Sequence, residues 1–232
     1  MTDLIDTTEM YLRTILELEE EGITPLRARI VERLEHSGPT VSQTVARMER
    51  DGLVRVGGDR RLELTEQGRE LAVAVLRKHR LAERLLADVI GLDWSYVHDE
   101  ACRWEHVMSD QVEQRLLEIL GHPTETPYGT PIPPRPESRS AAQWSAEMGL
   151  PGRVLSSVTA APGRYRVRSL AEGLQADPAL LAQLDAAGLR PGAVLQMRPI
   201  PETGYLHLQV DGGSEALELS PETAGHVWVE QA

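Results

Sequence analysis

A chain of 232 residues, of which 41% are hydrophobic, is long enough to form two or three domains with buried cores. Its longest apolar runs fall far short of the roughly 20 residues that a membrane span needs, and its acidic start lacks the basic region of a signal peptide, so we expect no membrane partner. A single cysteine, Cys102, excludes an internal disulfide and favours a reducing, cytoplasmic location.

The net charge of −12 argues against nucleic-acid binding by the chain as a whole, but the charge is unevenly distributed. Residues 24–61 carry eight arginines and five acidic residues, and no acidic residue occurs between Glu35 and Glu49. A local basic face, rather than the global charge, determines whether a protein binds phosphates. This segment is therefore the candidate nucleic-acid contact.

The N-terminal part of the chain changes from helical to strand periodicity. Apolar residues spaced by three or four predict helices over residues 3–21, 26–34 and 41–51. Gly38 is expected to permit a tight turn before the third helix. Alternating apolar residues over 52–65 flank a Gly-rich turn, which predicts a β-hairpin. A helix, a helix-turn-helix and a hairpin in this order indicate a winged helix.

The rest of the chain is predicted to be helical first and then β. Amphipathic patterns predict helices over residues 66–90, 95–107 and 110–120. Residues 121–149 contain six prolines and are predicted to be an extended linker. After the linker, five short strands are expected at 165–168, 194–197, 206–210, 217–219 and 227–229. One helix is expected among them, at 178–187. This spacing of short strands predicts a small barrel.

The start of the third predicted helix has the side chains of a DNA-reading surface, because base edges are read by short polar groups and methyls. Gln43 is placed to pair with a base edge, and Pro39 and Thr40 offer carbon surface to thymine methyls. Side chains expected to reach phosphates are Ser42, Thr44, Arg27, Arg47, Arg50 and Arg60. The alternative is a structural three-helix bundle with a polar face.

Potential metal ligands recur at one-turn spacing on two predicted helices. They are His79 and Glu83 on one helix, and His98, Cys102, Glu105 and His106 on the other. Imidazole and carboxylate suit Fe²⁺, Mn²⁺, Co²⁺, Ni²⁺ and Zn²⁺, and a thiol shifts the preference toward softer ions. The alternative is a solvated polar face with a buried cysteine. A Cys-rich structural zinc site is excluded, because the sequence has no C-x-x-C pair.

Four strings of the sequence are DTTEMYLRT at 6–14, SGPTVSQ at 37–43, KHRLAER at 78–84 and VHDEACRWEH at 97–106. Together they resemble the iron-dependent regulator family, also called the diphtheria toxin repressor family, in its iron-type branch. The resemblance is close over residues 1–120, looser over 152–230 and weakest in the Pro-rich linker.

The resemblance implies a mainly α fold with a β part, in three domains. The expected boundaries are 1–65 for a winged helix-turn-helix DNA-binding domain, 66–121 for a helical dimerisation and metal-binding domain, 122–150 for the Pro-rich linker, and 151–232 for an SH3-like β-barrel. The dimer interface is expected on the apolar helices, through Leu85, Leu86, Ile90, Trp104, Val107 and Leu116.

The resemblance also implies two metal sites in each subunit. A primary, activating site would use Met10, Cys102, Glu105 and His106. An ancillary site would use His79, Glu83 and His98, with Glu172 and Gln175 from the third domain. Among the DNA contacts, the resemblance adds Thr7 and Ser37 to the residues named above.

The function so implied is an Fe²⁺-activated repressor of iron-homeostasis genes that binds palindromic operators as homodimers, with two dimers on each operator. The sulfur ligands Met10 and Cys102 disfavour the hard ion Mn²⁺, although Co²⁺, Ni²⁺, Mn²⁺ and Zn²⁺ are expected to substitute in vitro. No small organic substrate is expected. Two rival functions are a metalloenzyme, for which no companion nucleophile or base motif is found, and a repressor that senses an organic ligand and keeps its histidines for structure.

Overall fold

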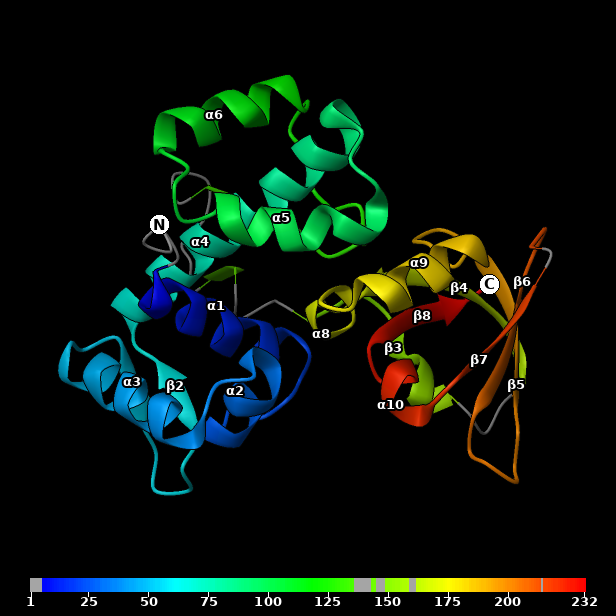
Figure 1. The fold of residues 1–232 in the computed structure, drawn as a ribbon, viewed down its shortest axis with the longest axis horizontal. Helices are drawn as coiled ribbons and strands as arrows, with labels where there is room; N and C mark the ends of the chain where they lie inside the picture. The colour runs from blue at the N-terminus through cyan, green and yellow to red at the C-terminus, as the bar shows by residue number, and fades with distance from the viewer. Residues whose placement is uncertain (1–5, 136–142, 145–148, 159–161, 214) are drawn as a thin grey trace. The chain divides into compact units, whose positions relative to one another are not determined.

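The computed structural model describes residues 6–135, 143–144, 149–158, 162–213 and 215–232 (Figure 1). The chain divides into two compact units. The first comprises residues 1–82, 101–124 and 132–149, and the second comprises residues 83–100, 125–131 and 150–232. Two helices, α4 and α5, run through these boundaries, so each of them contributes residues to both units.

The first unit begins with three helices, α1 (Thr7–Glu20), α2 (Arg27–Leu34) and α3 (Gly38–Arg50). Asp6 caps α1, because its side chain accepts hydrogen bonds from the backbone N–H groups of Thr8 and Glu9. The apolar faces of the three helices meet in one core that includes Tyr11, Ile30 and Val45. The three predicted helices are confirmed, and the predicted residues 3–5 lie outside the described residues.

The tight turn between α2 and α3 forms at Glu35 rather than at Gly38, where the sequence predicts it. Glu35 has a left-handed backbone, with φ of 54°, and ends α2. Gly38 is instead the first residue of α3, which Ser37 caps by accepting a hydrogen bond from the backbone N–H of Thr40. Side-chain capping by Ser37 therefore starts the helix three residues earlier than the apolar pattern predicts.

The predicted hairpin is confirmed as β1 (Val54–Val56) and β2 (Leu62–Leu64), which pair antiparallel with Val54 opposite Leu64. It leads into the long helix α4 (Glu66–Arg84). Gly68 lies where α4 passes the hairpin, and a Cβ atom there would be 2.0 Å from the backbone oxygen of Leu53. Only glycine therefore permits this close approach.

Two of the three predicted middle helices, over 66–90 and 110–120, are confirmed, and the third is shorter than its apolar pattern predicts. After α4, the π-helix η1 (Leu85–Ile90) ends at Gly91, which is left-handed. The 3-10 helix η2 (Trp94–Tyr96) then leads into α5 (Val97–Trp104). The predicted helix over 95–107 therefore ends early, and residues 105–107 form a turn. The helix α6 (Asp110–Ile119) follows, capped by Ser109.

The Pro-rich segment was predicted to be extended and unpacked, which is wrong for part of its described residues. In the second unit, Glu125 and Pro131 form a β-bridge, and between them Tyr128 is fully buried. The Tyr128 hydroxyl donates a 2.7 Å hydrogen bond to the backbone oxygen of Trp94. In the first unit, Trp144 is buried in the core of the three N-terminal helices. Aromatic side chains therefore anchor this segment at two points.

The second unit contains a six-stranded antiparallel sheet in the order β3-β8-β4-β5-β6-β7. The strands are β3 (Arg153–Val154), β4 (Gly163–Leu170), β5 (Val194–Pro199), β6 (Leu206–Val210), β7 (Ala216–Leu219) and β8 (Val227–Gln231). All five predicted strands are confirmed. The two-residue strand β3 is too short to show an alternating pattern, so the sequence missed it.

Helical segments connect the strands of this sheet: η3 (Leu155–Val158), α8 (Glu172–Gln175), α9 (Pro178–Ala186) and α10 (Pro221–Ala224). Helix α9 was predicted, and it begins at Pro178, directly after its capping residue Asp177. Within the second unit α9 packs on η2, and the guanidinium of Arg190 lies 4.9 Å from the ring centre of Trp94. None of the helices in the described part of the chain combines the length and apolar character that a membrane crossing requires.

Candidate metal centres and DNA interface

Helix α3 has a buried apolar face and an exposed polar face. Val41, Val45 and Met48 are fully buried against the N-terminal core. The predicted DNA contacts on and just before this helix are all exposed, together with Ala46 and Glu49; these contacts are Ser37, Pro39, Thr40, Ser42, Gln43, Arg47 and Arg50. Such a face can reach base edges and phosphates in a major groove.

Thr44 was expected to reach phosphates, and that prediction is wrong. It is buried, with 8% of its surface exposed, so its hydroxyl is not presented on the outer face of α3. Burial raises the pKa of Tyr11 above its ordinary value. The Tyr11 hydroxyl is 2.8 Å from Nδ1 of His36, so this buried tyrosine connects α1 to the turn between α2 and α3.

The remaining predicted DNA contacts come from three other elements of the first unit. Thr7 is the first residue of α1, and Arg27 is the first residue of α2, where its side chain is half-buried. Arg60 lies exposed in the hairpin turn with a left-handed φ of 68°. The neighbour of Thr7, Thr8, accepts a 3.4 Å hydrogen bond from Arg47 of α3.

The predicted primary ligands come from α1 and from the end of α5, all in the first unit. Met10 lies on α1, where it is half-buried against the N-terminal core. Cys102 lies on α5, and Glu105 and His106 lie in the turn that follows it. His106 Nε2 is 3.1 Å from Glu105 Oε1, and its Nδ1 is 2.7 Å from an oxygen of Glu9.

An arginine that the sequence did not single out lies among these ligands. Arg13 Nη1 is 2.5 Å from Glu105 Oε2 and 3.7 Å from the sulfur of Cys102. The same atom is 2.7 Å from Nδ1 of His79, on α4. The only sequence signal for this residue was its position three residues after Met10, on the same face of α1.

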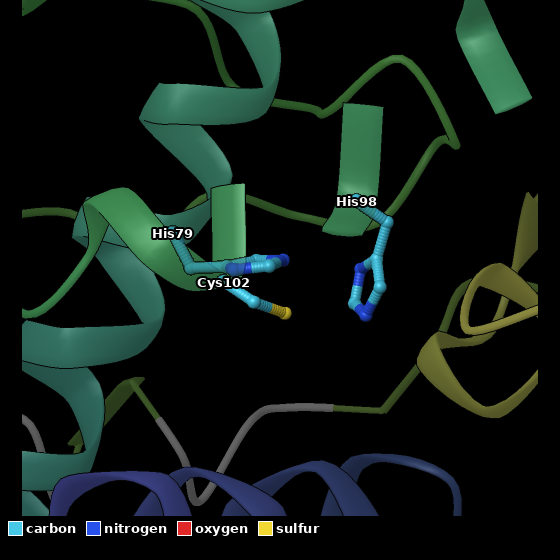
Figure 2. Close-up of side chains that lie close together, drawn as sticks. All are labelled: His79, His98 and Cys102. Atoms are coloured by element: carbon cyan, nitrogen blue, oxygen red, sulfur yellow. The ribbon is translucent and has the colours of Figure 1, made fainter. Parts of the chain in front are cut away.

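His79 was assigned to the ancillary site, yet its Nδ1 contacts a predicted primary ligand. This atom is 2.6 Å from Glu105 Oε2, and a ring nitrogen of His79 lies within 4.8 Å of the Cys102 sulfur. Figure 2 labels His79, which comes from α4, and Cys102, which comes from α5, together with His98, one turn before Cys102. The carboxylate of Glu105, 2% exposed, is thus buried among imidazole and thiol groups.

These residues fit a divalent cation. A buried carboxylate needs a positive partner, and here a guanidinium supplies one. The neighbouring thiol and imidazoles are donors that borderline and soft divalent ions prefer. The donor set of Cys102, Glu105 and His106, with the thioether of Met10 on α1, is therefore chemically suited to such an ion.

Four of the five predicted ancillary ligands, Glu83, His98, Glu172 and Gln175, lie in the second unit, and His79 lies in the first. His98 Nδ1 lies 3.2 Å from Glu83 Oε1 and 3.3 Å from Glu172 Oε2, and all three side chains are buried. One ligand atom from each of them lies within 4.8 Å of the others. His79 precedes Glu83 by one turn of α4. Two buried carboxylates beside one imidazole repel each other unless a cation is present, so this group also fits a metal.

The side chain of Gln175 is fixed by one hydrogen bond, and its amide oxygen is buried. Its amide nitrogen donates a 2.7 Å hydrogen bond to the backbone oxygen of Leu170. Its Oε1 atom is buried and has no hydrogen-bond partner among the described residues. Gln175 and Glu172 both belong to α8, a single turn of helix that strand periodicity could not reveal. A buried amide oxygen of this kind suits a metal ligand.

Tyr128 lies beside this second group of ligands. Burial, and secondarily the negative charge of Glu83, raises the pKa of Tyr128 far above its ordinary value. The phenol therefore stays neutral, and its hydroxyl donates a hydrogen bond to the backbone oxygen of Trp94. The Pro-rich segment thus places the buried ring of Tyr128 near the carboxylates of Glu83 and Glu172.

Three family models match successive parts of the chain. Residues 3–62 match the N-terminal DNA binding domain of iron dependent repressors, and residues 65–134 match their metal binding and dimerisation domain. Residues 158–231 match the FeoA domain. The chain belongs to the iron-dependent repressor family. Members of this family are DNA-binding transcriptional repressors and not enzymes, so the metalloenzyme alternative is excluded.

Relatives of known name cover the full length of this iron-dependent repressor. The iron-dependent repressor IdeR of Mycobacterium tuberculosis is 54% identical over 231 residues, 100% of each chain. The diphtheria toxin repressor of Corynebacterium diphtheriae is 52% identical over 232 residues, again 100% of each. Their full-length match confirms the family that the four sequence strings indicated.

Solved structures share the fold of this repressor over nearly its whole length. A manganese-dependent transcriptional repressor in complex with manganese has a TM-score of 0.80 and 27% identity, covering 97% of this chain and 100% of that one. IdeR of T. acidophilum has a TM-score of 0.76 and 26% identity, covering 98% and 99%. The expected fold class is thus confirmed, with a winged helix-turn-helix, a helical dimerisation domain and an SH3-like β domain.

Proposed function

We propose that this protein is an Fe²⁺-activated repressor of iron-homeostasis genes, which acts in the cytoplasm and binds palindromic operators as two homodimers. The observation that carries the proposal is the cluster of Cys102, Glu105, His79 and His106 in the same compact unit as the exposed face of α3. A metal-ligand cluster and a DNA-reading helix in one unit support a repressor whose DNA affinity depends on metal.

Iron is favoured by the donor atoms of the first cluster. The sulfur atoms of Met10 and Cys102 bind hard Mn²⁺ poorly, whereas Fe²⁺ accepts a mixture of sulfur, nitrogen and oxygen donors. The names of the full-length relatives, iron-dependent repressor and diphtheria toxin repressor, support the same metal. We expect Co²⁺, Ni²⁺, Zn²⁺ and, more weakly, Mn²⁺ to replace it in vitro.

Met10, Cys102, Glu105 and His106 would hold the activating metal, which when bound supplies two positive charges and directional bonds. Met10 lies on α1, and the other three lie on α5 or directly after it. Residues of α1 such as Tyr11 and Ile15 share one core with Val45 and Met48 of α3. Restraining α1 through Met10 would therefore restrain the recognition helix, which is how these ligands would favour the DNA-binding conformation.

A second metal would be held by His79, Glu83, His98, Glu172 and Gln175. Glu172 and Gln175 follow β4 directly, so this site would fix the start of α8 to the sheet. Neutralising two buried carboxylates would stabilise the fold. We propose that this site supports stability and that the first site controls activation.

Gln43 would read base edges, and Pro39 and Thr40 would contact thymine methyls. The side chains that would contact phosphates are Thr7, Arg27, Ser37, Ser42, Arg47, Arg50 and Arg60.

For the dimer interface, several large apolar side chains are exposed in the middle of the chain. They are Val107, Val112 and Ile119 in the first unit, and Val89, Ile90 and Tyr96 in the second. Large exposed apolar side chains of this kind support a subunit interface.

Of the six predicted interface residues, the structure exposes Ile90 and Val107, half-buries Leu85 and Trp104, and buries Leu86 and Leu116. We therefore place the proposed interface on the exposed members. The proposed domains are residues 1–65, 66–121 and 151–232, with a linker at 122–150.

A mobility-shift assay tests the proposal. A palindromic operator should be shifted with Co²⁺ or anaerobic Fe²⁺ and released by chelator. A shift of equal strength in chelator would overturn metal sensing, and the organic-ligand alternative would then be preferred. Comparing the mass of the shifted complex with that of one and two dimers tests the stoichiometry.

A further inference from the structure

Arg13 is a charged side chain buried inside the first ligand cluster, with only 6% of its surface exposed. Its Nη1 atom contacts Glu105 Oε2, the Cys102 sulfur and Nδ1 of His79, at 2.5, 3.7 and 2.7 Å. Its Nη2 atom is 3.6 Å from the same sulfur, and its Nε atom is 3.0 Å from Glu17. One guanidinium thus lies against a thiol, an imidazole and two carboxylates.

The His79 ring indicates that the guanidinium does not fully satisfy this cluster. Nδ1 of His79 faces both an N–H donor of Arg13 and a carboxylate oxygen of Glu105. A neutral imidazole nitrogen either accepts or donates, so no single tautomer suits both contacts. A cation that carries no proton would remove this conflict, because it accepts lone pairs from all of its neighbours.

We propose that Arg13 is the resident cation of the first cluster, and that it must withdraw before Cys102 and Glu105 can coordinate a divalent metal. The inference rests on the proposed function. The atoms that Arg13 contacts on these two residues are the side-chain atoms that would bind the metal. A guanidinium and a divalent ion repel each other strongly at such distances in a poorly solvated site. Arg13 therefore raises the metal concentration needed for activation.

Glu17 offers Arg13 a position to which it can withdraw. Glu17 lies one turn further along α1, is buried, and already pairs with the Arg13 Nε atom. The guanidinium can therefore rotate away from Glu105 and still keep a carboxylate partner. The buried carboxylate of Glu17 avoids the cost of leaving Arg13 unpaired.

The exchange also transfers the attachment of α1 from one side chain to another. In the present structure Arg13 ties α1 to Glu105 and to His79 of α4. In the proposed metal-bound form Met10 would take over this tie. Met10 and Arg13 are three residues apart and so share one face of α1. The point of attachment on α1 would move by nearly one helical turn. Helix α1 would thus be held through Arg13 without metal and through Met10 with metal, and would be attached in both states.

The test is Co²⁺ affinity in Arg13→Gln and Arg13→Lys, measured by competition with a fluorescent chelator under reducing conditions. Arg13→Gln removes the competing charge, so we expect Co²⁺ to bind the first cluster at least about tenfold more tightly than in wild type. Arg13→Lys keeps a competing positive charge, so its Co²⁺ affinity should rise less than that of Arg13→Gln. The sulfur-to-cobalt charge-transfer band identifies binding at Cys102.

Thermal unfolding gives a readout that does not depend on DNA binding. Without metal, Arg13→Gln removes the guanidinium that pairs with Glu105 and Glu17, so the Tm of this variant should fall below that of wild type. With saturating Co²⁺ the difference should shrink. Arg69→Gln is the matched control, because Arg69 also joins α4 to α1, through a 2.8 Å pair with Glu19. It should change Tm equally with and without metal and leave the Co²⁺ affinity unchanged.

Unchanged or weaker Co²⁺ binding in Arg13→Gln would overturn the inference, as would an equal gain in Arg69→Gln. If wild type gives no sulfur-to-cobalt band, the proposed function itself fails. Should both Arg13 variants fail to fold, nitrogen-15 NMR of wild type decides. The Arg13 guanidinium signal, assigned through its contact to the His79 ring, should lose that contact on Zn²⁺ saturation. A retained contact would overturn the proposal.

Discussion

Glu35 adopts a left-handed backbone in the turn that positions the recognition helix. Residues with a Cβ atom are strained there, whereas glycine is not. We expect Glu35→Gly to stabilise the protein by about 0.5–1 kcal/mol in urea unfolding. Gly38→Ala is the control: a Cβ atom at Gly38 would meet no atom of the described residues within 4 Å, so alanine should be tolerated. A large loss of stability in Gly38→Ala would mean that the tight turn depends on Gly38 rather than on Glu35.

At Gly68, unlike Gly38, we expect alanine to destabilise the protein, because a backbone atom limits the space around Gly68. An alanine Cβ would lie 2.0 Å from the backbone oxygen of Leu53, so either α4 or the hairpin would have to move. We expect Gly68→Ala to lower the free energy of unfolding by about 3 kcal/mol. Gly58→Ala, in the hairpin turn with open space around it, should be nearly neutral. Equal Tm values for the two variants would contradict the close approach.

Single residues were predictable where a local pattern determines them and unpredictable where the tertiary fold does. The spacing of His79 and Glu83 was visible in the sequence, because i and i+4 share a helix face. Arg13 was not, because an arginine on a helix is usually solvated, and only α4 and the turn after α5 bury this one. Thr44 was misread for the same reason: a short polar side chain is compatible with either face of α3.

At the scale of elements, α3 allows base readout to be separated from phosphate binding. Gln43 and Arg50 are both exposed on this helix. We expect Gln43→Ala to lower the preference for operator over scrambled DNA by about 1–3 kcal/mol. Arg50→Ala should weaken binding to both DNAs alike and reduce the salt slope by about 1. Competition binding at several salt concentrations measures both, and an unchanged specificity ratio in Gln43→Ala would mean that another face of α3 reads the bases.

Elements with strong periodicity were predicted well, and short irregular turns were not. The five predicted strands and most of the helices occur where expected. The π-helical turn after α4 and the early end of α5 were not foreseen, because apolar spacing continues through both. The turn after α5 carries Glu105 and His106, so the helix ends where the candidate ligands begin. The buried Tyr128 shows why proline content alone misjudged its segment.

At the scale of the whole molecule, the two candidate metal groups should differ in what their loss does. His106 belongs to the first unit, where it contacts Glu105 and Glu9. Glu172 belongs to the second unit, where it contacts His98. His79 is a poor choice for this comparison, because its Nδ1 contacts Glu105 while its helix position associates it with Glu83. Glu172→Gln therefore tests the ancillary group more cleanly than His79→Ala.

We expect His106→Ala to lower operator affinity in Co²⁺ by about 100-fold or more, because a ligand that would couple α1 to the turn after α5 is lost. Glu172→Gln should keep operator affinity within about tenfold and lower the metal-induced gain in Tm, since it removes one of two buried carboxylates around His98. Calorimetric metal titration, alongside operator binding in reductant, measures both variants. If Glu172→Gln silences DNA binding while His106→Ala leaves it intact, the group around His98 controls activation and the assignment of the two sites is reversed.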